Sequence, residues 1–468
     1  MNTQVAPAQG GHEPYAKPTS MGGTVKWTDT PRTRAKFEGD REALAAELRK
    51  HVNGEVRFDS ASQALYAADA SNYRQVPIGV VIPKDVDSVV ATVDICRKHG
   101  APIVNRGRGT SLAGQTVNAA VCIVFDKYLN EIIEIDPDNR VARVQPGCRL
   151  DDLRDQAEKF NLTFGPDPST HAWCSFGGMI GNNSCGVHSQ MAGRTEDNIY
   201  ELDVLTYDGA RMKVGATSDD ELERIVRGGG RRGEIYGKMR DLRDQYAAEI
   251  RRRYPNIPRR VSGYNLPELL PENGFQVARA LVGTEGTCVT VLEATIRLID
   301  SPPKRVLVVF GYEDIYSAGD HVPELNTFTG RGLVGLEAMD EKLIRFMRWQ
   351  GIHTDYLHLL PAGGGFLIAE FGAETVDDAV GIARKCMDMV KGKDGSKTPD
   401  MRLYTDPVVE EHLMKIREAG LGATAHVRGL SWPGWEDSAV PPDRIGDYLR
   451  DLQKLYEKYG YDASLYGH

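Results

Sequence analysis

The sequence predicts an α+β protein with more than one domain, and three observations lead to that class. The chain has 468 residues, which exceeds the size of one ordinary domain. Apolar strand-like runs alternate with segments of helical periodicity. A pair of prolines at 302 and 303, after the strand-like VLEATIRLI, marks a boundary. The expected parts are a flexible N-terminal arm over 1–40, a first domain over 41–300 and a second domain over 301–468.

The first part of the chain alternates between helix and strand. Residues 41–52 form an expected helix, and SNYRQVPIGVVIP enters a sheet. Asp85 then caps a helix whose valines follow the i, i+3, i+4, i+7 pattern, and Gly100 ends it. The runs APIV, VCIVFD, ARVQPG and ELDVLTYDG read as further strands, and LDDLRDQAEKF reads as a short helix.

The part after the two prolines repeats the alternation. VLVVFGY, LVGLEAMDEKLIRFM and GGGFLIAEFG give strand and helix patterns, followed by a helix from about 376 to 391. GKDGSKTPD at 392–400 is an expected polar turn.

Two glycine-rich loops, each fed by an apolar run, are the strongest functional signal. One reads RGRGTSLAGQTVN, and the other reads FGPDPSTHAWCSFGGMIGNNSCGVHS. Glycine lets a backbone approach a ligand closely and adopt positive φ, so such loops direct main-chain amides at an anion such as a diphosphate. The first loop lacks the G-x-G-x-x-G spacing of a Rossmann fold, and the chain contains no G-x4-G-K-[ST] phosphate loop. A large dinucleotide held from two sides fits better, although each loop alone is also typical of a simple turn between strands.

These loops, together with VSGYNL and LVGTEGT further along, resemble the FAD-binding domain of PCMH type found in the vanillyl-alcohol oxidase family. Within that family the chain resembles the branch of D-lactate, glycolate and D-2-hydroxyglutarate dehydrogenases. The resemblance implies a two-subdomain FAD-binding domain, then a ferredoxin-like substrate domain with an antiparallel sheet. It also implies that the chain is the N-terminal part of an FAD and iron-sulfur oxidoreductase.

The resemblance assigns cofactor contacts residue by residue. The expected pyrophosphate loop comprises Arg106, Gly107, Gly109, Thr110, Ser111, Gly114 and Gln115. The expected second cradle comprises Pro166, Asp167, Gly177, Gly178, Gly181, Asn182, Gly186 and His188. Glu285, with Gly286 beside it, is expected to support the flavin-side loop by accepting main-chain N–H bonds. Because the first loop contains no histidine, we expect the FAD to be bound non-covalently.

Substrate chemistry is expected from the second domain. Arg417 matches the family arginine that holds the substrate carboxylate, although Met414 replaces the usual tryptophan; the alternative is an exposed helix arginine. Glu436 and Asp437 stand where relatives place groups near the substrate. His188 is a candidate catalytic residue, and a structural hydrogen-bonding role is the competing interpretation.

The final SLYGH resembles the start of the family's histidine signature, in which two histidines bind a divalent metal. His468 is therefore an expected metal ligand, of zinc for example, in a complete protein. One imidazole cannot supply the three ligands of a catalytic zinc site. We therefore expect a truncated substrate domain and slow oxidation by this chain alone, with a non-catalytic FAD-binding subunit or fragment as the alternative.

Composition excludes some classes of binding partner. A net charge of −9 argues against nucleic-acid binding as a main role, and no apolar run reaches the length of a transmembrane segment. The seven cysteines form no C-x-x-C pair, so buried reduced thiols are expected. The resemblance implies a 2-hydroxy acid substrate and an iron-sulfur or quinone-linked electron acceptor. It also implies a cytoplasmic location, with a peripheral position at the inner membrane face left open.

Overall fold

A computed structural model describes residues 37–391, 398–425 and 437–468. The N-terminal arm, most of the expected turn at 392–400, His426 and Glu436 lie outside these residues. Within them, no helix is long and apolar enough to cross a lipid bilayer.

The first sheet confirms the predicted alternation. Its strand order is β1-β2-β4-β3, with β1 antiparallel to β2 and the other pairs parallel. The strands are β1 (Gly54–Arg57), β2 (Gly79–Pro83), β3 (Ile103–Arg106) and β4 (Val121–Val124); the helices around them are α1 (Arg41–His51), α2 (Ser60–Leu65) and α3 (Val86–Lys98). The Asp85 carboxylate accepts from the Ser88 N–H at the start of α3, and Gly100 has φ +65° just beyond its end.

The second sheet is antiparallel, in the order β5-β6-β10-β8-β9. Its strands are β5 (Ile132–Asp136), β6 (Val141–Val144), β8 (Ile199–Leu205), β9 (Arg211–Val214) and β10 (Thr290–Arg297). The largest hydrophobic core of this half forms where α4 (Leu150–Ala157), α5 (Phe176–Asn182) and α9 (Val277–Leu281) pack on it. A short pair, β7 (Leu162–Thr163) with β11 (Ile299–Asp300), follows.

The third sheet is antiparallel, in the order β15-β12-β14-β13-β16. Its strands are β12 (Lys304–Tyr312), β13 (Leu333–Asp340), β14 (Gly365–Ala373), β15 (Asp400–Tyr404) and β16 (Tyr466–Gly467). Side chains alternate between its faces, so two cores form. One core includes α10 (Ile315–Asp320), α11 (Val322–Asn326), α13 (Val376–Lys391) and α16 (Ile445–Tyr459); the other includes α12 (Glu341–Gln350), α14 (Pro407–Glu418) and α15 (Gly420–Ala425).

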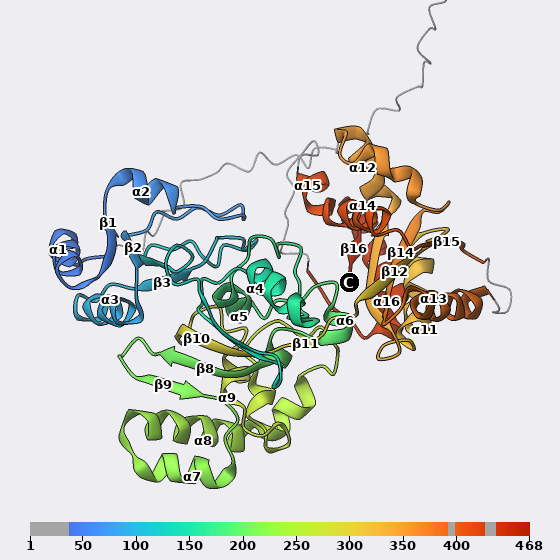
Figure 1. The fold of residues 1–468 in the computed structure, drawn as a ribbon. Helices are drawn as coiled ribbons and strands as arrows, with labels where there is room; N and C mark the ends of the chain where they lie inside the picture. Colours follow the sequence, from blue (N-terminus) through green and yellow to red (C-terminus); the bar gives the residue numbers. More distant parts are fainter. Residues whose placement is uncertain (1–36, 392–397, 426–436) are drawn as a thin grey trace, which may run out of the picture.

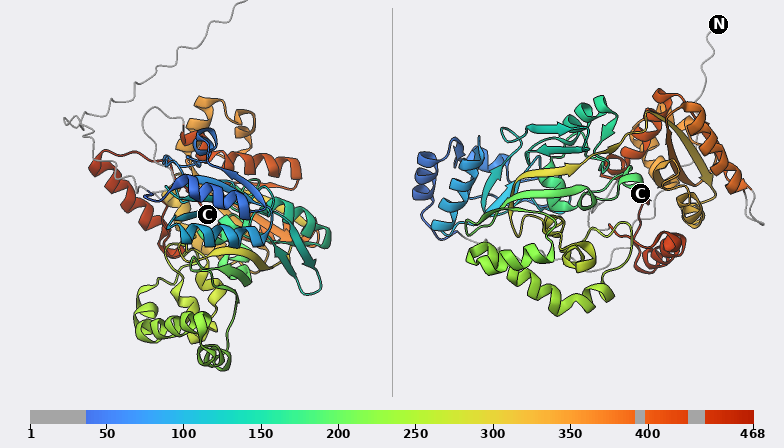
Figure 2. Two further views of the ribbon diagram at one scale, coloured as in Figure 1. Left: turned by 90° about the vertical axis from the view of Figure 1, so that its left-hand side faces the viewer. Right: turned by 60° about the horizontal axis from the view of Figure 1, so that its bottom comes forward.

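The third sheet and its helices lie beside the first two sheets (Figures 1 and 2). The short helix α6 (Ser189–Ala192), which follows the second glycine-rich loop, lies against β13. The glycine-rich half of the chain is therefore in direct contact with the third sheet.

Periodicity did not reveal two helices. The first is α5, which forms inside the second glycine-rich loop despite three glycines in seven residues. The second is the 24-residue α8 (Gly230–Arg253), which pairs with α7 (Asp219–Gly228). The basic run at its end is largely paired: Arg251 with Glu272, and Arg252 with Glu249.

Candidate functional site

The first glycine-rich loop connects β3 to β4 and depends on glycine at two positions. Gly109 and Gly114 have φ of +70° and +81°, which only glycine adopts without strain. Arg106 is buried, and its guanidinium donates to Ala68 O at 2.8 Å and to Thr116 O at 3.5 Å. Its side chain therefore holds the loop in shape from within.

The second loop presents an open face made of glycine. A methyl group added at Gly178 would meet nothing nearer than Ser175 Oγ at 3.8 Å, and one added at Gly181 would meet nothing nearer than Glu285 Cα at 3.9 Å. The Ser175 hydroxyl itself is buried and has no hydrogen-bond partner. Glycines with free space beside them, next to an unpartnered hydroxyl, are the features expected of a ligand cradle.

The LVGTEGT segment joins these two loops. The Glu285 N–H donates to Gly181 O at 2.9 Å, and the Glu285 carboxylate accepts from the Asn182 amide at 3.4 Å. Gln115, from the first loop, also hydrogen-bonds to this carboxylate. The expectation that Glu285 accepts main-chain N–H bonds is therefore wrong in detail, because its carboxylate interacts with side-chain amides. Its φ of +53° is unusual for a non-glycine residue, and Gly286 follows at +69°.

The expected cofactor residues separate into two groups. Thr110 and Ser111 are half-buried in the first loop, which touches the second where Gly107 approaches Ser175. Pro166 and Gly186 are instead buried beneath this surface, and a methyl group at Gly186 would lie 1.8 Å from the Asp167 carbonyl oxygen. Gly177 is likewise packed against Pro146, 3.0 Å from where its methyl group would stand. This second group shapes the cradle from behind.

His188 lies between two carboxylates from different domains. Its Nδ1 is 2.5 Å from Asp167 Oδ2, and its Nε2 is 2.6 Å from Glu370 Oε2 on β14. Arg305 Nη1 is 3.0 Å from the same Nε2, a contact that only a neutral imidazole could accept. The two short carboxylate contacts require a proton on each ring nitrogen, so we assign His188 as an imidazolium.

This environment excludes His188 as a proton acceptor. Burial by itself lowers the pKa of His188, but the charges of Asp167 and Glu370 outweigh it and raise the pKa to about 10. Burial raises the pKa of Glu370, and the charges of His188 and Arg305 outweigh that effect and lower it to about 2. This environment favours the structural interpretation of His188, and a catalytic His188 stays a prediction.

This cluster predicts a pH dependence of stability. Because the pKa of His188 is raised in the folded state, its contribution is fully present below pH 6.5 and is lost as the pH rises through about 10. Glu370 has a lowered pKa, so its contribution is present above pH 4.5 and is lost as the pH falls through about 2. Thermal unfolding of the wild type and of His188→Asn across pH 5 to 10 should show a difference in midpoint that shrinks above pH 6.5. A constant difference would contradict the imidazolium assignment.

Arg417 lies on α14 with only 5% of its surface exposed, so the alternative of an exposed helix arginine is wrong. Its Nε is 2.7 Å from Glu337 Oε2 on β13, and its guanidinium lies 4.9 Å from the centre of the Tyr466 ring. The Nε–H is not aligned with the carboxylate, so this contact is an ion pair without a hydrogen bond. No oxygen of the described residues accepts a hydrogen bond from Arg417 Nη1 or Nη2.

His468 shares the Glu337 carboxylate with Arg417. Its Nδ1 is 2.6 Å from Glu337 Oε1, while Glu337 is 1% exposed. Burial raises the pKa of Glu337, and its interactions with His468 and Arg417 outweigh this effect and lower it. In the part of the chain that the structure describes, no three His, Cys, Asp or Glu side chains converge as metal ligands. The described residues therefore do not fit a catalytic zinc ion, and His468 as a metal ligand finds no support among them.

Four residues of the candidate site were not predicted from the sequence: Glu337, Glu370, Arg305 and Arg259. The two glutamates had a usable signal, because each is a lone carboxylate inside an apolar strand, in LVGLEAMD and in FLIAEFGA. Arg259 donates to Gly186 O at 2.7 Å, which ties the segment before VSGYNL to the second cradle. Neither arginine has a local pattern that distinguishes it from a surface residue. Asp437 is exposed at the edge of the described residues.

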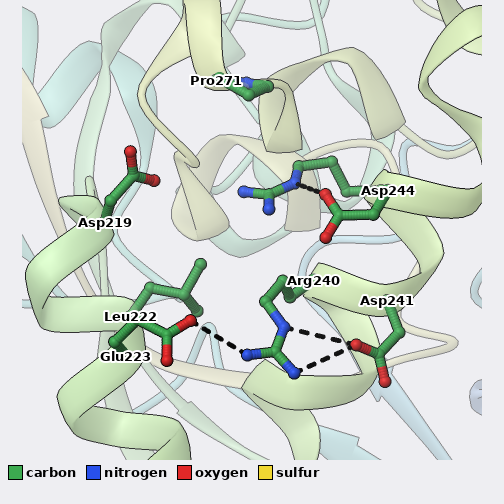
Figure 3. A pocket seen from close by; sticks show the side chains of 8 residues that line it. Asp219, Leu222, Glu223, Arg240, Asp241, Asp244 and Pro271 are labelled. Carbon is green, nitrogen blue, oxygen red and sulfur yellow. Dashed lines mark hydrogen bonds and ion pairs between the residues drawn. The ribbon is translucent and has the colours of Figure 1, made fainter.

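A separate surface hollow of about 590 Å³ lies between α7 and α8 (Figure 3). Arg240 there pairs with Glu223 and Asp241, and Arg243 pairs with Asp244. None of the expected site residues lines this hollow. The converging loops and the Arg417 cluster remain the candidate site.

Comparison with known families agrees with this arrangement. Residues 77–215 match the family described as FAD binding domain, and residues 301–468 match the C-terminal domain of FAD linked oxidases. The expected truncation of the second domain stays a prediction. The two matches cover both glycine-rich loops and the sheet that carries Glu337 and Glu370.

Curated relatives are about one quarter identical to the chain over the aligned residues. D-2-hydroxyglutarate dehydrogenase of Pseudomonas putida is 26% identical over 441 residues, which cover 91% of this chain and 43% of the relative. Glycolate oxidase subunit GlcD of Bacillus subtilis is 27% identical over 430 residues, covering 89% and 77%. D-lactate dehydrogenase of Archaeoglobus fulgidus is 25% identical over 427 residues, covering 88% and 76%. The chain thus spans less than half the length of the first of these relatives.

Among solved structures, 4-ethylphenol oxidase from Gulosibacter chungangensis has the same fold, with a TM-score of 0.59 at 14% identity over 91% of this chain and 80% of that one. Alkyldihydroxyacetonephosphate synthase gives a TM-score of 0.54 at 15% identity, covering 80% and 65%. With both domain families matched and the fold shared, the chain belongs to the PCMH-type FAD flavoproteins that join an FAD-binding domain to the C-terminal domain of FAD-linked oxidases.

Proposed function

We propose that this chain is the flavin and substrate module of a dehydrogenase that oxidises a D-2-hydroxy acid. Electrons then pass to an iron-sulfur or quinone-linked acceptor. The names of the relatives support the substrate class, because they comprise D-2-hydroxyglutarate and D-lactate dehydrogenases and a glycolate oxidase subunit. FAD, when bound, accepts the hydride at its N5 atom. The domain limits 41–300 and 301–468 and a cytoplasmic location belong to the same proposal.

The observation that carries this proposal is the state of Arg417. It is a buried guanidinium whose Nη1 and Nη2 groups donate to no oxygen of the described residues. An arginine presents its N–H groups in a fork that matches a carboxylate in a bidentate pair. A buried cation with donors to spare is therefore suited to an anionic ligand, and a 2-hydroxy acid supplies one.

His468 is proposed to face the substrate hydroxyl. Glu337 engages its Nδ1, which sets the tautomer and leaves Nε2 as the nitrogen available to accept a proton. His188 cannot take this role, because both of its nitrogens are held by carboxylates.

The FAD is proposed to occupy the surface formed by the first loop, Gly178, Gly181, Asn182 and the Glu285 segment. The first loop contains no histidine, so the link to the flavin is expected to be non-covalent. Acid precipitation of the purified holoprotein should release the yellow colour into the supernatant. Colour that stays in the pellet would contradict this expectation.

Anaerobic reduction tests the proposed function directly. The FAD-loaded chain is mixed with D-2-hydroxyglutarate, D-lactate or glycolate, and flavin absorbance is followed. We expect bleaching by a D-2-hydroxy acid and none by the L enantiomer. We expect the rate of flavin reduction to be on the order of 10²-fold lower than in an enzyme whose metal ion polarises the substrate hydroxyl. A chain that holds FAD but is bleached by none of these acids would support the alternative, a non-catalytic FAD-binding subunit.

A further inference from the structure

The FAD-binding half and the third sheet meet at a buried charged cluster centred on His188. We propose that His188 is a positioning residue: held as a cation between Asp167 and Glu370, it fixes the second glycine-rich cradle on the third sheet, whose Glu337 pairs with Arg417 of α14. It thereby sets the distance between the bound flavin and the bound substrate carboxylate. Only the kinetic test of this proposal depends on the proposed function.

The cluster is built for a charged histidine. Asp167 accepts twice from the same residue, from the His188 backbone N–H at 2.8 Å and from Nδ1 at 2.5 Å. Glu370 receives Nε2 at 2.6 Å, across 182 positions of sequence. His188 and Asp167 are 8% and 7% exposed, so the pairs are shielded from water. Removing one partner of such a pair leaves a buried charge uncompensated, which is strongly unfavourable.

Charged groups from every surrounding element balance this cluster. Arg305 on β12 approaches Glu370 to 3.5 Å, and Arg154 on α4 lies 3.9 Å from Asp167. Glu410 on α14 is coupled to both Glu370 and Arg305, and burial together with the charge of Glu370 raises its pKa to about 7. With His188 and Arg305 positive, the charges of Asp167 and Glu370 are neutralised. A neutral residue at position 188 would remove the cation that contacts both carboxylates, and would leave Asp167 facing Arg154 at 3.9 Å and Glu370 facing Arg305 at 3.5 Å.

The position of His188 controls what lies next to it. The preceding Val187 packs on Gly335 of β13, where an added methyl group would lie 2.8 Å from Val187 Cγ1. The start of α6 therefore packs directly against the backbone of β13 at Gly335. Glu337, two residues along on the same face of that strand, holds Arg417. One residue before Val187, Gly186 O accepts from Arg259. A shift of His188 would therefore move the cradle relative to Arg417.

Two isosteric substitutions separate the two halves of the cluster. The amide nitrogen of asparagine can replace Nδ1, so His188→Asn keeps the contact with Asp167 and loses the contact with Glu370. The amide nitrogen of glutamine can replace Nε2, so His188→Gln keeps a neutral hydrogen bond to Glu370. His99→Asn is a matched control, because His99 pairs with Glu47 at 2.8 Å within the first half of the chain.

Hydrogen–deuterium exchange of the FAD-loaded full chain gives the first readout. In His188→Asn we expect the peptides that cover α6 and residues 333–337 of β13 to exchange on the order of tenfold faster or more, because the contact between the domains opens more often. His188→Gln should recover part of this protection, and His99→Asn should leave both peptides unchanged. Wild-type protection in His188→Asn would overturn the proposal.

Substrate kinetics give the second readout. His188→Asn should raise KM for the D-2-hydroxy acid on the order of tenfold while FAD content stays at one per chain, because the cradle is intact and only its distance from Arg417 is released. If His188→Asn does not fold, Glu370→Gln loosens the same contact from the other side and should show the same exchange pattern. Loss of FAD without faster exchange at β13 would assign His188 to the cradle alone and contradict the proposal.

The two proposals fail in distinguishable ways. If no acid reduces the flavin but His188→Asn still speeds exchange at α6 and β13, the positioning role stands and the proposed function falls. If an acid reduces the flavin and exchange and KM are unchanged in His188→Asn, the positioning role falls and the proposed function stands.

Discussion

Replacing Arg417 with alanine is expected to lower kcat/KM for a D-2-hydroxy acid on the order of 100-fold or more, because the substrate carboxylate loses a buried bidentate partner. FAD content should not change, since Arg417 lies on α14 and the glycine-rich loops lie in the other half of the chain. Arg417→Lys should recover only part of the activity, because an ammonium cannot reproduce the planar fork. Stopped-flow reduction of the flavin measures each variant.

The control for this prediction must separate substrate binding from folding. Arg417→Ala leaves Glu337 buried beside His468 alone, and this costs stability. The double variant Arg417→Ala/Glu337→Gln removes that uncompensated charge, so its stability should return while its activity stays low. Arg348→Ala, at an exposed position of α12, should change neither stability nor activity. Activity restored in the double variant would return Arg417 to a purely structural role.

Replacing Gly178 with glutamate is expected to abolish FAD binding without harming the apoprotein. The position is exposed, and a methyl group there meets no atom nearer than 3.8 Å, so the folded chain has room for a side chain. Glutamate also has a higher helix propensity than glycine, which costs roughly 0.5–1 kcal/mol relative to alanine inside a helix. A carboxylate beside a diphosphate is repelled and fills its path of approach. Titration of the apoprotein with FAD should show at least a 100-fold loss of affinity, with the unfolding temperature unchanged.

Two further glycine variants make this test specific. Gly381→Glu adds the same side chain to α13, where a methyl group has no atom within 4 Å, and it should not affect FAD binding. Gly109→Glu should also prevent binding, but it strains a backbone at φ +70° and crowds the Arg106 guanidinium, so it destabilises the fold as well. Normal FAD affinity in Gly178→Glu would remove α5 from the cofactor surface.

Local patterns were sufficient for most of the fold. The valine spacing after Asp85 gives α3 with its cap, because helical periodicity and an N-cap act over a few neighbouring residues. The short apolar runs VLVVFGY and FLIAEFG give β12 and β14, because such runs are typical of buried strands. Glycine content misled in one place: the segment expected to be a loop at FGGMIGN is helix α5, because its apolar residues Phe176, Met179 and Ile180 are buried against the second sheet. Tertiary packing there outweighs the poor helix propensity of glycine.

From the sequence alone came the expectation that two glycine-rich loops hold a large anionic cofactor, because glycine spacing is a local property of the chain; the LVGTEGT segment was added to this expectation by the family resemblance. Only the tertiary structure decided the roles of His188 and Arg417. The partner of His188 is Glu370, 182 residues away, and Arg417 meets Glu337 from another element of the same domain. The charges that domain packing brings together decide whether a histidine is a base or a cation held between carboxylates. They also decide whether an arginine is exposed, or buried with free donors. No local sequence pattern encodes that packing.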